Sequence, residues 1–117
     1  VKVVTTKQTK RKIGVGTGLT WMLTDKNEGL VDDDLFYCFV NLENNTEEIN
    51  FRFFVVPSKL VSKYLKKSFQ YWIDEKSSRD KNNKVRIFLL GEHGEEYPAK
   101  FETLMQEDYE DNWDQLK

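Results

Sequence analysis

The residues of this sequence that are best placed to do chemistry are basic, and they fall into two groups. The first group opens the chain, because residues 1–12 hold five basic side chains and no acidic one. The second group lies within residues 58–75, where lysines recur at three- and four-residue steps. Clustered cations attract a polyanion such as DNA. Lys7, Lys10, Arg11, Lys12, Lys63 and Lys67 are therefore the candidate nucleic-acid-binding residues of this chain.

The second group belongs to a predicted amphipathic helix over Ser58–Glu75. Its apolar residues recur at helical spacing, and Ser58 is a favourable N-cap after a strand that ends at Pro57. The opposite face carries Lys59, Lys63, Lys66, Lys67 and Gln70. A basic helix face is often only a solvated surface. The sequence therefore leaves two interpretations of these lysines, a solvated face and a phosphate contact.

Three further features resemble chemical sites, and each has a simpler explanation. The run Asp32–Asp34 offers carboxylates to a hard cation, but its side chains diverge in extended chain, and we interpret the run as a solvated turn. The alternate glycines of residues 13–18 lack the third glycine of a nucleotide-binding loop, since Leu19 stands in its place. His93 is the single histidine, which is too few for a zinc centre or a catalytic triad.

These residues need a scaffold, and the apolar runs predict it. The run Leu35–Leu42 is apolar on both faces, as in a central strand, and residues 51–56 return beside it after a polar turn. Further strands are predicted over residues 1–6, 19–23 and 85–90. We expect all five strands to form one mixed sheet with the helix Ser58–Glu75 on one face, in a single α/β domain of residues 1–117.

Composition limits where such a domain works. The chain is 32% charged and 14% aromatic, as in soluble globular proteins, and no apolar run approaches the roughly 20 residues of a membrane span. We expect no membrane partner. The one cysteine, Cys38, falls in the central strand, where we expect a core residue in a cytoplasmic protein. The acidic tail after residue 92 is expected to dock through Trp113 and Leu116.

Five segments also follow one another in an informative order. They are Val1–Thr6, Trp21–Leu23, Asp34–Leu42, Phe53–Lys59 and Tyr109–Leu116. Together they resemble the C-terminal part of a family of restriction-endonuclease-like proteins in the PD-(D/E)XK nuclease superfamily. The resemblance covers nearly the whole chain. It implies a restriction-endonuclease-like fold with a mixed central sheet and flanking helices, with DNA as partner and Mg²⁺ as cofactor.

The resemblance also implies a catalytic site, and there the chain departs from the family. The family's Mg²⁺ is held by an acidic residue on one strand and an (Asp/Glu)-x-Lys motif on the next, and it activates water. That motif would fall on Lys2 and Val4, and neither residue matches. Lys2, Lys7 and Gln8 remain near the expected site. We expect an N-terminally incomplete nuclease-like fold, with the first acid upstream of Val1.

Two hypotheses for function follow. The first is a nuclease-like domain that binds DNA and, with carboxylates supplied from upstream, cleaves it in a Mg²⁺-dependent reaction. The second is a non-catalytic module that keeps the scaffold and binds DNA, a protein partner or another copy of itself. Salt-sensitive binding without cleavage is the signature of the second.

Overall fold

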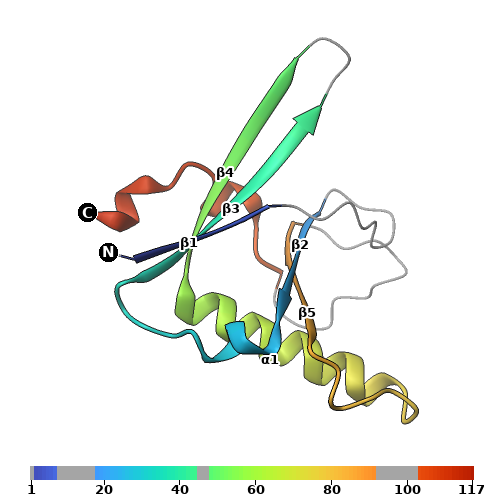
Figure 1. Ribbon diagram of the computed structural model, residues 1–117. Helices are drawn as coiled ribbons and strands as arrows, with labels where there is room; N and C mark the ends of the chain where they lie inside the picture. The colour runs from blue at the N-terminus through green and yellow to red at the C-terminus, as the bar shows by residue number, and fades with distance from the viewer. Residues whose placement is uncertain (1, 8–17, 45–47, 92–102) are drawn as a thin grey trace.

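The computed structural model describes residues 2–7, 18–44, 48–91 and 103–117 (Figure 1). In chain order the elements are β1 (Lys2–Lys7), β2 (Leu19–Thr24), the 3₁₀ helix η1 (Asp25–Gly29), β3 (Leu35–Asn44), β4 (Ile49–Pro57), α1 (Ser58–Glu75), β5 (Val85–Leu90), η2 (Gln106–Asp108) and η3 (Trp113–Leu116). The protein is a mixed α/β structure. The five predicted strands and the predicted helix are all present in the described ranges.

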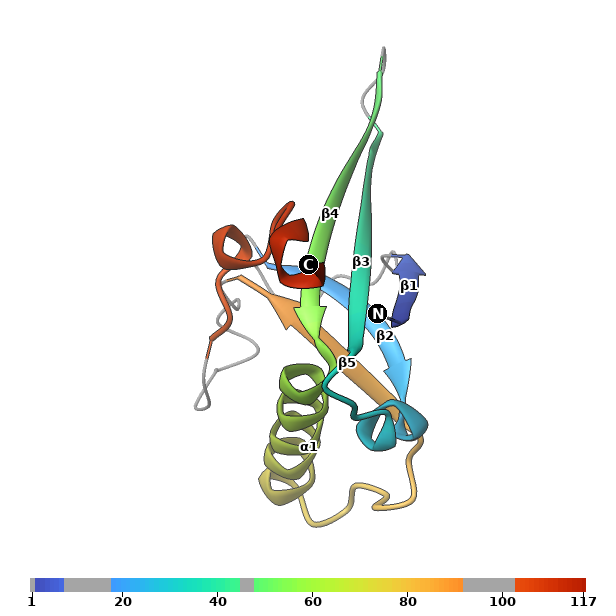
Figure 2. The same cartoon turned by 90° about the vertical axis from the view of Figure 1, so that its left-hand side faces the viewer.

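The strands form two sheets, so the prediction of a single sheet is wrong. One sheet has the order β1-β3-β4, with β1 parallel and β4 antiparallel to β3, whereas β2 pairs with β5 in a separate antiparallel sheet. Figure 2 shows β2 and β5 running diagonally behind the β3–β4 hairpin. The physical reason is that an apolar run identifies a strand but not its partner, and β2 finds its partner far along the chain.

The core lies where the two sheets and α1 meet. Trp21 of β2 is fully buried, and its ring centroid lies 4.9 Å from that of Phe39 and 5.7 Å from that of Phe54. Its indole N–H donates a hydrogen bond of 3.0 Å to the carbonyl of Val40. Trp21 therefore joins the two sheets. The other buried apolar residues of this cluster include Tyr37, Val56, Val61, Tyr64, Leu65, Phe88 and Leu90.

The predicted bounds of α1 are confirmed, but the predicted role of Ser58 is wrong. Pro57 occupies the N-cap position and Ser58 is the first helical residue. Ser58 is fully buried, and its hydroxyl donates a 2.8 Å hydrogen bond to the carbonyl of Asp32 and accepts one of 3.1 Å from the Asp32 N–H. Burial thus directs this hydroxyl to the neighbouring loop. No helix in the described ranges has the length and hydropathy needed to cross a membrane.

Cys38 lies inside β3 as predicted. Its side chain is buried, and this burial raises the pKa of the thiol. The thiolate is the form that reacts with metals and oxidants. Cys38 therefore acts as a small packing residue in the folded chain.

The acidic tail docks along the outer edge of β4. The Val55 N–H donates to the carbonyl of Tyr109, and the Asp111 N–H donates to the carbonyl of Phe53, both at 2.9 Å. The tail packs Trp113 on Phe53, with ring centroids 6.0 Å apart, as the sequence suggested. However, the tail is also held by backbone pairing, which the apolar spacing could not indicate.

An ion pair between Arg52 and Glu110 fastens this tail. Two guanidinium nitrogens of Arg52 donate to the two carboxylate oxygens of Glu110, each at 2.8 Å. These hydrogen bonds lower the pKa of the Glu110 carboxyl. A lowered carboxyl pKa stabilises the fold above the unfolded-state value of about 4.3, and this stabilisation is lost as pH falls through the folded-state pKa.

We expect Glu110→Gln to lower the free energy of unfolding by about 0.5–1 kcal/mol at neutral pH, because the pair is about one-third exposed. At an acidic pH below the folded-state pKa of Glu110, the difference from the natural chain should shrink, since both then carry an uncharged side chain. Urea denaturation at the two pH values measures this. Glu107→Gln, an exposed change in the same segment, is the control. Equal losses at both pH values would show that the charge of Glu110 contributes nothing.

Candidate nucleic-acid interface

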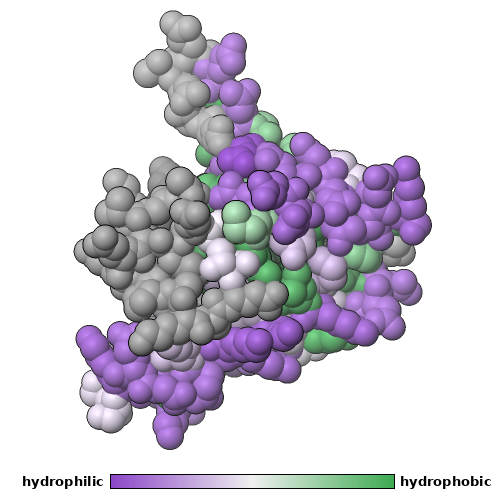
Figure 3. Space-filling view, turned by 180° about the vertical axis from the view of Figure 1, so that it is seen from behind, coloured by the Kyte–Doolittle hydropathy of each residue, from purple (hydrophilic) through white to green (hydrophobic). Residues whose placement is uncertain are grey.

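The exposed face of α1 carries a row of four lysines, Lys59, Lys63, Lys66 and Lys67. We call these four residues the lysine row. Steps of three and four residues place them on one side of the helix, over about 12 Å of its axis. Figure 3 shows hydrophilic side chains along the lower rim of the molecule, where α1 and the loop after it lie. The predicted exposure of Lys63 and Lys67 is confirmed, and their contact with DNA stays a prediction.

Only the first member of the lysine row meets an acidic partner among the described residues. Lys59 forms an ion pair with Asp33, and its hydrogen bond to that carboxylate raises the pKa of the ammonium group. No described carboxylate lies within ion-pair distance of Lys63, Lys66 or Lys67. These three ammonium groups therefore present their charge to the solvent and to any polyanion there.

The aspartate run forms an exposed turn, as the sequence favoured. The Asp34 N–H donates a 2.8 Å hydrogen bond to the carboxylate of Asp32, while Asp33 holds Lys59. Within the part of the chain that the structure describes, no group of three or more His, Cys, Asp or Glu side chains is arranged to hold a metal ion. The contacts that the run makes are local: Asp32 closes the turn and Asp33 pairs with Lys59.

The N-terminal basic group lies elsewhere. Lys2 and Lys7 bound β1, where they are paired in backbone register with Leu35 and Val40 of β3. Figures 1 and 2 both place β1 beside β3 and apart from α1, which packs against η1, β3, β4 and β5. The structure therefore does not bring β1 to the lysine row. The predicted contacts Gln8, Lys10, Arg11 and Lys12 lie outside the described residues, as do His93 and residues 13–17.

Sequence reasoning missed two arginines that stack on aromatic rings of α1. The Arg79 guanidinium lies 4.6 Å from the centroid of the Trp72 ring and donates to the Trp72 carbonyl at 2.7 Å. The guanidinium of Arg86 lies 3.4 Å from the centroid of the Phe69 ring. Cation–π contacts of this kind favour arginine. One signal was present in the sequence, since a charge inside the apolar run of β5 needs a buried partner.

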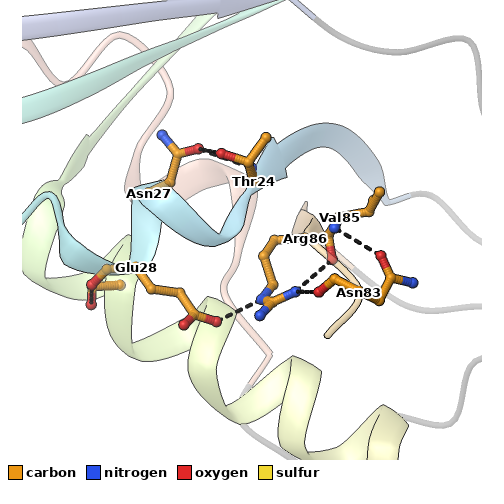
Figure 4. Close-up of polar contacts among 7 residues, drawn as sticks. Thr24, Asn27, Glu28, Asn83, Val85 and Arg86 are labelled. Carbon is orange, nitrogen blue, oxygen red and sulfur yellow. Dashed lines mark hydrogen bonds and ion pairs between the residues drawn. The ribbon is translucent and has the colours of Figure 1, made fainter. Parts of the chain in front are cut away.

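That partner is Glu28 (Figure 4). Arg86 is only 7% exposed, and its Nε donates to the Glu28 carboxylate at 2.6 Å. It also donates to the backbone carbonyls of Asn83 and Val85, at 2.6 and 3.0 Å. The Glu28 carbonyl accepts a 2.6 Å hydrogen bond from Ser62 of α1. This cluster ties η1, β5 and α1 together, so it fixes the helix that presents the lysine row.

The lysine row is suited to binding a phosphate backbone. Ammonium groups contact phosphates as point charges, and such contacts position a protein on DNA without reading its bases. No family model, curated protein or solved structure matches this chain. The function is therefore inferred from the geometry and charges of the chain's own residues.

Proposed function

We propose that this chain binds DNA through the lysine row of α1. The observation that carries the proposal is the exposure of Lys63, Lys66 and Lys67 on one face of a helix, without a described carboxylate in reach. The whole chain has a net charge of −2, so attraction to DNA has to come from this local charge. Binding of this kind is independent of sequence and sensitive to salt.

The same proposal includes a restriction-endonuclease-like fold and a cytoplasmic location. Its support is the ordered resemblance to PD-(D/E)XK proteins, together with a lone buried thiol that suits a reducing compartment. The proposal extends to Mg²⁺-dependent cleavage of DNA if a longer polypeptide supplies the family's carboxylates upstream of Val1. The alternative function is a non-catalytic module on the same scaffold, whose partner is DNA or a protein.

The test is a double charge reversal, Lys63→Glu with Lys67→Glu, measured by fluorescence anisotropy on labelled duplex DNA across a salt series. We expect affinity at low salt to fall by roughly tenfold or more, and the slope of log affinity against log salt to decrease by about two. The reason is that two phosphate contacts become repulsions.

The matched control is Lys81→Glu with Lys84→Glu, which makes the same charge change on exposed loop residues. If the two double variants bound DNA with equal affinity, the lysine row would be only a solvated face and not a DNA contact. The same duplex incubated with Mg²⁺ separates the two hypotheses. Cleavage that EDTA abolishes supports the nuclease, whereas intact DNA with salt-sensitive binding supports the non-catalytic module.

A further inference from the structure

The β3–β4 hairpin continues beyond the core as an arm, formed by residues 41–44 and 49–52. Figures 1 and 2 show it projecting from the end of the molecule opposite α1. Leu42 and Phe51 are opposite each other in the register, as are Asn41 and Arg52. Since side chains alternate along a strand, Leu42, Ile49 and Phe51 share one face of the arm, whereas Asn41, Asn50 and Arg52 share the other.

The apolar face of the arm is the one turned away from the core. Leu42, Ile49 and Phe51 are 52%, 63% and 57% exposed. The register places them on the side of β3 and β4 opposite the buried Phe39 and Phe54. An amphipathic sheet normally hides its apolar side and solvates the polar one. Among the described residues, nothing covers the apolar side of the arm. A binding partner is therefore a natural candidate to cover it.

The exposed residues join into one patch that reaches the C-terminal tail. Phe51 stacks on Phe53 with centroids 6.3 Å apart, and Phe53 packs on Trp113, which is itself 42% exposed. We call Leu42, Ile49, Phe51, Phe53 and Trp113 the apolar arm face. Its exposed surface is roughly 400 Å², taking about 200 Å² for each large side chain. The largest apolar patch of a soluble monomer is typically of about this size and is often functional.

We propose that the apolar arm face is the interface between two copies of this chain. In a two-fold dimer each residue of the face meets the same face of the partner, so the surface has to complement itself. The five side chains of the apolar arm face carry no charge, and two such sheet faces can pack about 10 Å apart without bringing like charges together.

The area also fits a dimer. A standard interface takes about 800 Å² from each partner. The apolar arm face supplies about half of this from its exposed side chains, as the apolar centre of the contact. The half-buried Val40, which lies opposite Phe53 in the register and so shares its face, is placed at the edge of this centre. Because the arm lies opposite α1, the dimer leaves both lysine rows accessible.

The test is the mass of the protein in solution, measured by sedimentation equilibrium from low micromolar to several hundred micromolar. We expect the natural chain to dimerise in this range. Phe51→Lys should weaken the dimer at least tenfold, because it buries an unpaired charge from each copy. Asn50→Lys places the same charge on the next residue of β4, which is exposed on the opposite face of the arm, and it should leave the dimer unchanged.

A monomer at every concentration would overturn the proposal, as would equal weakening by Phe51→Lys and Asn50→Lys. Leu42→Lys is a second variant on the same face, and both residues are more than half exposed, so their substitution should leave the fold intact. Circular dichroism checks this. DNA binding by the lysine row is measured separately with Lys63→Glu and Lys67→Glu. These two changes should leave dimerisation, measured by sedimentation equilibrium, unaltered.

Discussion

Replacing Trp21 with alanine should lower the free energy of unfolding by about 4 kcal/mol. The side chain is fully buried, and its ring centroid lies 4.9 Å from that of Phe39, 5.7 Å from that of Phe54 and 6.4 Å from that of Phe88. The truncation opens a cavity between the two sheets. It also removes the N–H that binds the Val40 carbonyl. Urea denaturation followed by circular dichroism measures the loss.

Met22→Ala is the control, because Met22 is the next residue of β2, points to the other side and is 44% exposed. We expect it to change stability by less than about 0.5 kcal/mol. Trp21→Phe keeps an aromatic ring but loses the indole N–H, and an intermediate loss of about 1–2 kcal/mol is expected. If Trp21→Ala and Met22→Ala behaved alike, Trp21 would not be the residue that joins the sheets.

Arg86→Met should lower the free energy of unfolding by about 3 kcal/mol. The substitution keeps an apolar stem against Phe69 but leaves the Glu28 carboxylate, 20% exposed, without its partner. The backbone carbonyls of Asn83 and Val85 lose their donor as well. Because removal of one member of a buried ion pair is the costly step, the double variant Glu28→Gln with Arg86→Met should lose less than the sum of the single changes.

Arg79→Met is the matched comparison for this cycle. Arg79 also stacks on a ring of α1, but its acidic neighbour Glu75 is 3.8 Å away and 45% exposed. We expect a loss of only about 1 kcal/mol. A loss from Arg86→Met no larger than that of Arg79→Met would mean that the buried ion pair contributes little to the position of α1.

The parts of the fold that depend on local pattern were predictable. The bounds of α1 follow from apolar residues at helical spacing, and β3, β4 and β5 follow from short apolar runs between polar turns. The division into two sheets was not predictable, because β2 pairs with β5 across most of the chain. The local pattern is the same for either arrangement. The prediction that Ser58 is the N-cap was wrong for a related reason, since its hydrogen-bond partner Asp32 lies on a loop distant in the sequence.

The candidate interface was predictable to a similar extent. The exposure of Lys63 and Lys67 follows from the helical period alone, which fixes the side of α1 that faces the solvent. The neutralisation of Lys59 by Asp33 depends on how the turn before β3 folds back, so no spacing reveals it. The identity of the buried partner of Arg86 was likewise not predictable. However, a charged residue between apolar strand residues indicated that some buried partner was required.

The docking of the tail on β4 also affects how the protein is made. Arg52 and Glu110 are separated by 58 positions in the chain. Likewise, β2 pairs with β5, which follows it much later in the chain. A ribosome therefore exposes β4 and β2 well before it has synthesised the segments that pair with them. Pairings this distant slow folding, and unpaired strand edges are prone to aggregate in the meantime. The edge of β4 thus stays unpaired until residues 109–111 have emerged, and a truncation before Tyr109 would leave that edge open.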